Sequence, residues 1–243
     1  MRSKLPCRVV RLSSVILASS LICVPARAQD PAADVRAERA RLVSQFPEAF
    51  APVTDDPAQL RVLLIGDSIS IGYTPAVREL LKGIANVHRI PDNAGTTTRG
   101  VAMLDEWLGK AKWDLIHVNF GLHDIARDNK GASRTSQTDY ETNLRTLVSR
   151  LQGTGARVIF ATTTPVPDAN VTPSRRNDDV LAYNQAARNV MQEFGVPVND
   201  LYPVAFARLS ELQQPANVHF TPDGYRALAE RVAASIRAAL PTK

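Results

Sequence analysis

The feature that most constrains the fold of this chain is a short apolar run that ends at a glycine. Residues Val62–Ile65 are all Val, Leu or Ile, and Gly66, Asp67 and Ser68 follow directly before a segment compatible with a helix. An apolar run of this length fits a strand that is buried on both faces, as in a parallel sheet. Open α/β folds bind ligands beyond the carboxyl ends of such strands, so Ser68 is a candidate nucleophile if a histidine reaches it.

Further apolar runs alternate with helical patterns from residue 61 onward. We expect strands at Val62–Ile65, Val87–Ile90, Leu115–Phe120, Ala156–Ala161 and Val196–Asn199. We expect helices at Pro75–Lys82, Arg99–Leu108, Thr138–Leu151, Asp179–Phe194 and Asp223–Ala239. Strands that alternate with helices are typical of βαβ units, so the pattern predicts a three-layer α/β/α sandwich around a five-stranded, mainly parallel sheet.

Residues 1–28 have the pattern of a secretory signal peptide. Basic residues precede the apolar stretch Val15–Val24, which is shorter than the roughly 20 residues of a membrane span. Small residues follow at Ala26 and Ala28, as at a cleavage site, so we expect the mature chain to begin at Gln29. This predicts a secreted or periplasmic protein without stable membrane insertion; an uncleaved N-terminal anchor is the alternative.

Removal of this segment changes the charge of the protein. The full chain has 29 Lys and Arg and 24 Asp and Glu. Five of the basic residues and none of the acidic ones lie in residues 1–28, which leaves 24 of each sign. The mature chain therefore has no basic excess for nucleic acid. Both cysteines, Cys7 and Cys23, also lie in this segment, so a disulfide cannot stabilise the mature domain.

The loops that follow the expected strands carry polar and glycine residues. The first loop has Ser68, the second has Gly95, and the third has Gly121–Asp124. His219 precedes the last helix. Because loops after parallel strands meet at one edge of a sheet, we expect these residues to lie together. Acyl transfer needs a nucleophile, a base and donors for an oxyanion, and these loops contain all three.

These residues resemble the SGNH (GDSL-type) hydrolase family at four places, Gly66–Ser70, Gly95, Gly121–Asp124 and His219. The resemblance implies a flavodoxin-like sandwich and cleavage of carboxylic esters, often acetyl groups on sugars. The general α/β-hydrolase motif Gly-x-Ser-x-Gly fits less well, because Ser70 stands at its second glycine. We accordingly divide the chain into a signal peptide (1–28), an N-terminal arm (29–60) with a helix over Asp34–Gln45, and a hydrolase domain (61–243).

The resemblance also implies a role for each site residue. Ser68 corresponds to the nucleophile, and its own N–H and that of Gly95 correspond to oxyanion donors. His219 corresponds to the general base. Neither a cofactor nor a metal is implied, and the expected partner is a small-molecule or glycan ester.

The chain departs from the family pattern in the third block. The family has asparagine as an oxyanion donor where this chain has His123. A neutral imidazole can still donate one N–H, so we expect His123 to act as the donor; a hydrogen bond within its loop is the alternative. We expect the adjacent Asp124 to fix the loop.

A second departure concerns the general base. The family has aspartate three residues before the histidine, and Ala216 stands there in this chain. The imidazole of His219 could instead be oriented by Asn217, by a backbone carbonyl or by a remote acid such as Asp200. An amide orients an imidazole without stabilising its charged form, which predicts a slower enzyme.

Four other residues receive structural interpretations. We expect His88 and His117 to be strand residues with satisfied side chains, because no metal-ligand spacing surrounds them. Arg175 and Arg176 lie in the polar loop 165–177. We expect both to be solvated; contact with an acidic glycan is the alternative.

Together these observations predict a secreted serine esterase that cleaves short acyl esters, acetyl above all, with carbohydrate as the expected acceptor. One alternative is a glycan O-acyltransferase that uses the same residues. The other is a non-catalytic glycan-binding protein on a degenerate hydrolase fold. Ala216 and His123 favour that second alternative, whereas the presence of both Ser68 and His219 argues against it.

Overall fold

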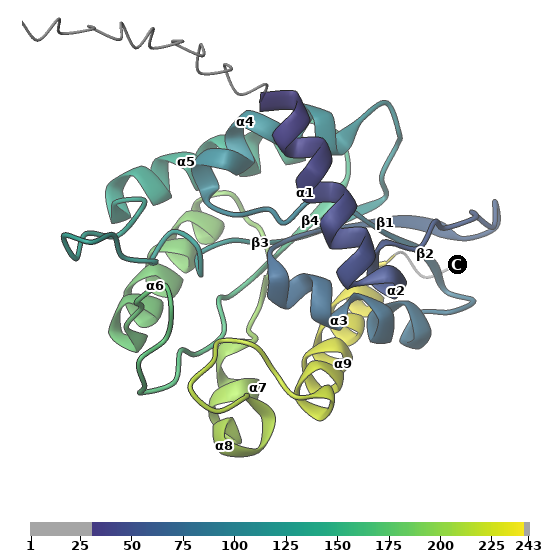
Figure 1. The fold of residues 1–243 in the computed structure, drawn as a ribbon. Coiled ribbons are helices and arrows are strands. Elements are labelled where there is room, and N and C mark those ends of the chain that lie inside the picture. The colour runs from purple at the N-terminus through teal and green to yellow at the C-terminus, as the bar shows by residue number, and fades with distance from the viewer. Residues whose placement is uncertain (1–30, 241–243) are drawn as a thin grey trace, which may run out of the picture.

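A parallel sheet with the strand order β2-β1-β3-β4-β5 organises the chain (Figure 1). The computed structural model describes residues 31–240. Its strands are β1 (Leu60–Ile65), β2 (Ala85–Arg89), β3 (Leu115–Asn119), β4 (Arg157–Ala161) and β5 (Val198–Asn199). All four strand pairings are parallel, which confirms the predicted fold class.

Helices cover both faces of this sheet. They are α1 (Pro31–Gln45), α2 (Pro47–Phe50), α3 (Ser68–Leu80), α4 (Thr97–Leu108), α5 (Gln137–Gln152), α6 (Asn177–Glu193), α7 (Tyr202–Phe206), α8 (Leu209–Leu212) and α9 (Pro222–Ala239). Figure 1 shows α3 and α9 together on one side of the sheet and α4, α5 and α6 on the other. The last helix buries Leu228, Val232 and Ile236, which recur at helical spacing and face the core.

The central strands place the loops that matter for function. β1 pairs with β2 on one side and with β3 on the other, so Ile65 lies opposite Val118 in the neighbouring strand. The chain moves from β1 to β2 in one direction and then crosses back to β3. Such a reversal opens a crevice between the strand ends, which is where ligands bind in open α/β sheets. Val62–Ile65 are at most 1% exposed, as expected for a strand covered on both faces.

The first helix of the sheet region differs from the prediction. It begins at Ser68 and runs through Pro75, instead of beginning at Pro75. Asp67 caps it, because its Oδ1 accepts a hydrogen bond from the Ile69 N–H at 2.9 Å. Pro75 lacks the N–H that would bond to the carbonyl of Ile71, yet the helix continues past it. The consequence is that Ser68 occupies the first helical position.

The short helices α7 and α8 were not predicted. They fill the connection between β5 and His219, and each is too short to show an amphipathic period in the sequence.

The N-terminal arm packs on the domain through α1 and α2. Leu42 and Ala49 are buried against Ile71 of α3. Arg39 of α1 donates two hydrogen bonds to Asp92, with Nε–Oδ1 and Nη2–Oδ2 distances of 2.7 and 2.9 Å. Figure 1 shows α1 crossing the molecule and leading into α2 beside α3.

The predicted signal peptide lies outside the described residues. Within residues 31–240, no helix is long and apolar enough to cross a membrane.

Candidate active site

Ser68 and His219, which lie 151 residues apart in the sequence, meet at the carboxyl edge of the sheet. The Oγ atom of Ser68 is 2.9 Å from Nε2 of His219. The turn before Ser68 requires a glycine, because a Cβ on Gly66 would lie 2.6 Å from the Cβ of Ser70. The apolar strand, the glycine and the helix start therefore bring the hydroxyl to the surface of the crevice.

Asn217 fixes the orientation of the His219 ring. Its Oδ1 atom is 2.8 Å from Nδ1 of His219 and also accepts the backbone N–H of His219 at 3.0 Å. Because that backbone N–H needs an acceptor, the side-chain oxygen of Asn217, and not its nitrogen, faces the ring. An oxygen can only accept, so Nδ1 carries the proton and the lone pair of Nε2 faces Ser68. This is the tautomer that a general base requires.

The environment of His219 favours its neutral form. Burial lowers the pKa of this imidazole, the charge of Asp67 partly opposes the effect, and the charge of Arg175 adds to it. The ring is therefore unprotonated at neutral pH and can accept a proton from Ser68.

The remote acid considered from the sequence lies elsewhere. Asp200 accepts hydrogen bonds from Thr162 Oγ1 at 2.8 Å and from Arg188 Nη2 at 2.7 Å, and it has no bond to His219. Ala216, at the position of the family aspartate, sits in a turn with a φ of 49°.

Two backbone N–H groups are candidates for binding an oxyanion. The N–H of Ser68 belongs to the first turn of α3, where it lacks an intrahelical acceptor. The N–H of Gly95 donates to Oδ1 of Asn93 at 3.1 Å. Gly95 has a φ of 67°, a conformation that favours glycine. To bind an oxyanion, the N–H of Gly95 must first break its hydrogen bond to Oδ1 of Asn93.

His123 lies in the same cavity as Ser68 and His219 and is half-buried. Its imidazole has no hydrogen-bond partner among residues 31–240, so nothing there occupies its N–H. Burial lowers the pKa of His123, which Asp67 opposes and Arg175 reinforces. The neighbouring Asp124 is bound to the start of α4, because its Oδ1 accepts the N–H and hydroxyl of Thr97 at 2.9 and 2.6 Å.

A cavity of about 290 Å³ lies over the two catalytic candidates. It is lined by Arg41, Leu42, Gln45, Phe46, Ser68, Ile71, Asn93, Leu122, His123, Thr172, Pro173, Arg175, Val218 and His219. The N-terminal arm thus forms one wall and the loop 165–177 forms another. The position of the loop 165–177 beside the site follows from the sequence, whereas no sequence pattern predicts the N-terminal arm there.

The structure corrects the expectation for Arg175. This residue is only 8% exposed, and its Nε donates to the carbonyl of Leu122 at 2.7 Å. Its Nη1 donates to the carbonyl of Pro173 at 3.0 Å. The loop folds back over the third strand-end loop, and a polar loop sequence gives no local signal of such a contact. Arg176 is exposed, as expected.

Each of the two strand histidines has a polar partner at Nε2, but Nδ1 of His117 is buried without one, contrary to the expectation of a satisfied side chain. Nε2 of His117 is 3.1 Å from Nδ2 of Asn199, and Nε2 of His88 is 2.6 Å from Oδ1 of Asp55. Burial lowers the pKa of His117 to about 4. In the described part of the chain, no group of three or more His, Cys, Asp or Glu is placed to hold a metal ion.

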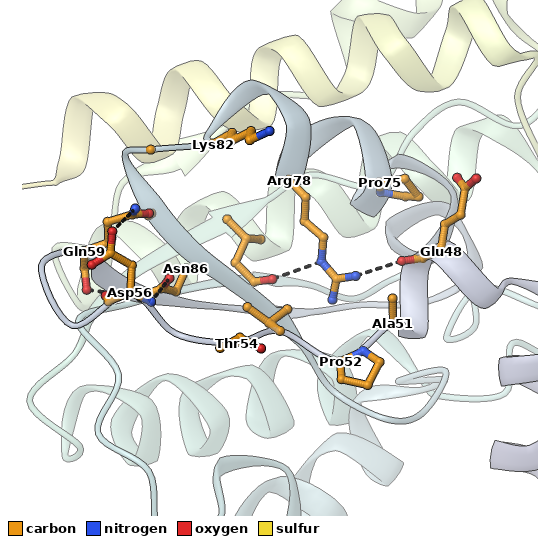
Figure 2. Close-up of a pocket in the computed structure, with 14 residues that line it drawn as sticks. Glu48, Ala51, Pro52, Thr54, Asp56, Gln59, Pro75, Arg78, Lys82 and Asn86 are labelled. Carbon is orange, nitrogen blue, oxygen red and sulfur yellow. Dashed lines mark hydrogen bonds between the residues drawn. The ribbon is translucent and has the colours of Figure 1, made fainter.

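A second cavity, of about 560 Å³, lies between residues 51–59 and the edge strand β2 (Figure 2). Its lining contains no serine, cysteine or histidine. Figure 2 shows its arginine, Arg78, donating to the carbonyls of Val87 and Glu48. This cavity lacks the nucleophile and base that acyl transfer needs.

Comparison with known proteins agrees with this geometry. Residues 64–227 match the GDSL-like Lipase/Acylhydrolase family, and the chain belongs to that family. It is therefore a carboxylic ester hydrolase, and the non-catalytic alternative is set aside. No curated protein matches the chain.

Solved structures share the fold at low identity. An acetyl xylan esterase has a TM-score of 0.63 and 16% identity, with 73% of this chain and 100% of that chain covered. A lipase/acylhydrolase from Enterococcus faecalis has a TM-score of 0.62 and 22% identity, covering 76% and 98%. An acetylxylan esterase from Geobacillus stearothermophilus has a TM-score of 0.59 and 19% identity, covering 73% and 94%.

Proposed function

We propose that this protein is a serine esterase that removes short acyl groups, acetyl above all, from carbohydrate esters. The observation that carries the proposal is the 2.9 Å contact between Ser68 Oγ and His219 Nε2, with Asn217 holding the ring in the basic tautomer. Two further observations support the substrate class. The cavity is small, and two of the similar structures are acetyl xylan esterases.

The first half of the reaction acylates the enzyme. Ser68 Oγ attacks the ester carbonyl carbon while its proton passes to Nε2 of His219. The oxyanion that forms is bound by the N–H groups of Ser68 and Gly95 and by the ring N–H of His123. Loss of one such donor typically costs about 3 kcal/mol in the transition state. His219 then donates its proton to the leaving alcohol oxygen as the carbon–oxygen bond breaks.

The second half releases the acyl group. A water molecule gives a proton to His219 Nε2 and attacks the acyl carbon, which forms a second oxyanion in the same place. The bond to Ser68 Oγ then breaks, the proton returns to the serine, and the carboxylic acid leaves. His219 is the proton acceptor in both halves of the reaction, and burial keeps the pKa of its imidazole low.

The test is hydrolysis of p-nitrophenyl acetate by the chain from Gln29 onward, compared with Ser68→Ala. We expect kcat to fall on the order of 10⁴-fold or more, because the nucleophile is lost while folding is unchanged. Ser149→Ala, an exposed serine on α5, is the matched control and should retain full activity. Comparable turnover by Ser68→Ala would overturn the assignment of the nucleophile.

The same assay separates hydrolysis from transfer. A hydrolase passes the acyl group of the Ser68 intermediate to water, whereas an acyltransferase passes it to a sugar hydroxyl. We expect free acetate to remain the main product when xylose or glucose is added. An acetylated sugar as the main product would favour the O-acyltransferase alternative.

We also propose export of the protein, supported by the basic and apolar pattern of residues 1–28. N-terminal sequencing of the exported protein should give a start at Gln29. Recovery of the full-length chain in the cytoplasm would contradict the proposal.

A further inference from the structure

The catalytic cavity has an unbalanced set of charges. Two of its lining residues, Arg41 and Arg175, are cations, and none is a carboxylate. The carboxylate whose field reaches both His219 and Arg175 belongs to Asp67. Asp67 does not line the cavity, is only 2% exposed, and caps α3 through its Oδ1. The side chains that line the space above Ser68 therefore carry a net positive charge.

Arg175 has donors that the protein does not use. A guanidinium has five N–H groups, and the two hydrogen bonds of Arg175 engage only Nε and Nη1. Its Nη2 has no partner within residues 31–240, and no carboxylate pairs with the residue there. Yet 92% of its surface is covered, given its exposure of 8%. Nη2 is the part of this guanidinium that stays open to the cavity, where it can donate a charge-assisted hydrogen bond to an anion.

Three partly buried arginines are bonded differently from Arg175. Arg39 and Arg127 each make paired hydrogen bonds with a carboxylate, Asp92 and Asp179 respectively. Arg89 also has no carboxylate partner; both of its Nη atoms donate to backbone carbonyls, and its Nε is buried without a partner. Arg175 differs in lining the catalytic cavity with Nη2 unused.

We propose that the substrate carries a negative charge close to the scissile ester, and that Arg175 recognises this charge. The inference rests on the proposed function, because the ester must lie on Ser68. A carboxylate is the expected group, since a guanidinium donates to it with charge-assisted hydrogen bonds. The substrate class is then an acetylated acidic sugar. Arg41, exposed at the rim and bound to Gln45, adds to the positive potential at the entrance.

The experiment compares two esters that differ only in this charge, an O-acetylated methyl glucuronide and the matching O-acetylated methyl glucoside. Acetate release is measured at low and high salt. We expect the wild-type kcat/KM to favour the glucuronide by about 10-fold to 100-fold, the range that a hydrogen bond to a charged group supports. A third ester, p-nitrophenyl hemisuccinate, carries the charge on the acyl side and shows which side faces Arg175.

The variants separate recognition from a structural role. Arg175→Gln keeps a donor for the Leu122 carbonyl and removes the charge. It should abolish the preference for the glucuronide, measured as the ratio of the two kcat/KM values, in which any effect of the lost charge on His219 is common to both esters. Arg176→Gln, the exposed neighbour, is the matched control and should leave the preference intact.

The outcomes distinguish this inference from the proposed function. Wild-type hydrolysis of both sugars at equal rates would overturn the inference and leave the esterase intact. An equal loss on both esters in Arg175→Gln would also overturn it, since Arg175 would then serve the loop or the oxyanion. Failure of the wild type on p-nitrophenyl acetate would overturn the proposed function itself.

Discussion

The floor and the walls of the catalytic cavity are built in different ways. The floor consists of Ser68 at the start of α3, His123 in the loop after β3, and His219 before α9. The walls come from α1 and from the loop 165–177, which tertiary contacts hold in place. Ser68 and His219 match a family pattern, His123 departs from it, and the wall residues carry no motif. The comparison suggests that the chemistry is set by the strand ends and the choice of substrate by segments added around them.

A variant that weakens the attachment of α1 to the domain tests the role of this helix as a wall of the cavity. Arg39→Ala removes two of the hydrogen bonds to Asp92, a carboxylate that is 0% exposed. We expect a loss of roughly 2 kcal/mol in unfolding free energy, less than for a fully buried pair because Arg39 is partly exposed. KM should rise several-fold while kcat stays near the wild-type value. Urea unfolding and steady-state kinetics measure the two effects.

The pH dependence of this loss provides a control. Burial alone would raise the pKa of Asp92, but hydrogen bonds from Arg39 and Trp107 outweigh it and lower the pKa. A lowered pKa in the folded state gives stability that is present above the ordinary value near 4. It is lost as the pH falls through the folded pKa. The stability difference between wild type and Arg39→Ala should therefore shrink below about pH 4, and a constant difference would contradict the assigned ion pair. Glu106→Gln, at the exposed end of the same Arg39 network, should cost less.

A change at Asn217 tests how the ring of His219, on the floor of the cavity, is oriented. Asn217→Asp keeps an oxygen 2.8 Å from Nδ1 and adds a negative charge that stabilises the imidazolium. We expect kcat/KM to rise by about tenfold, equivalent to one pKa unit of added stabilisation. The carboxylate should also raise the pKa of His219, so the acidic limb of the pH profile should move to higher pH.

A matched variant checks that this effect is local. Asn189→Asp adds the same charge at an exposed position of α6 and should change neither the rate nor the pH profile. If Asn217→Asp changed neither kcat/KM nor the acidic limb of the pH profile, Asn217 would not act on His219.

The smallest effect is expected at the third oxyanion position. His123→Asn restores the residue that the family pattern has there and still supplies an N–H donor. We expect kcat to stay within about threefold of wild type or to rise, as measured on p-nitrophenyl acetate. A loss of a hundredfold or more would assign the imidazole a different role in the reaction.

The sequence predicted the elements that local patterns determine. The apolar runs at Val62–Ile65 and Leu115–Phe120 became β1 and β3 within two residues at each end. Prediction failed where distant contacts decide the structure. Pro75 is typical of a helix start, yet the Asp67 cap and the packing of α3 against α9 carry the helix through it. Arg175 appeared solvated because its neighbours in the sequence are polar, whereas its burial depends on Leu122, 53 residues away.

The charge of the cavity also bears on how the enzyme is freed after each turnover. Hydrolysis of any carboxylic ester yields an acid, which is an anion at neutral pH. Arg175 and Arg41 therefore face the product of the reaction as well as its substrate. No carboxylate in the lining of the site repels the acetate ion once it has formed. Release of acetate then competes with binding of the next ester, and free acetate should act as a competitive inhibitor that salt weakens.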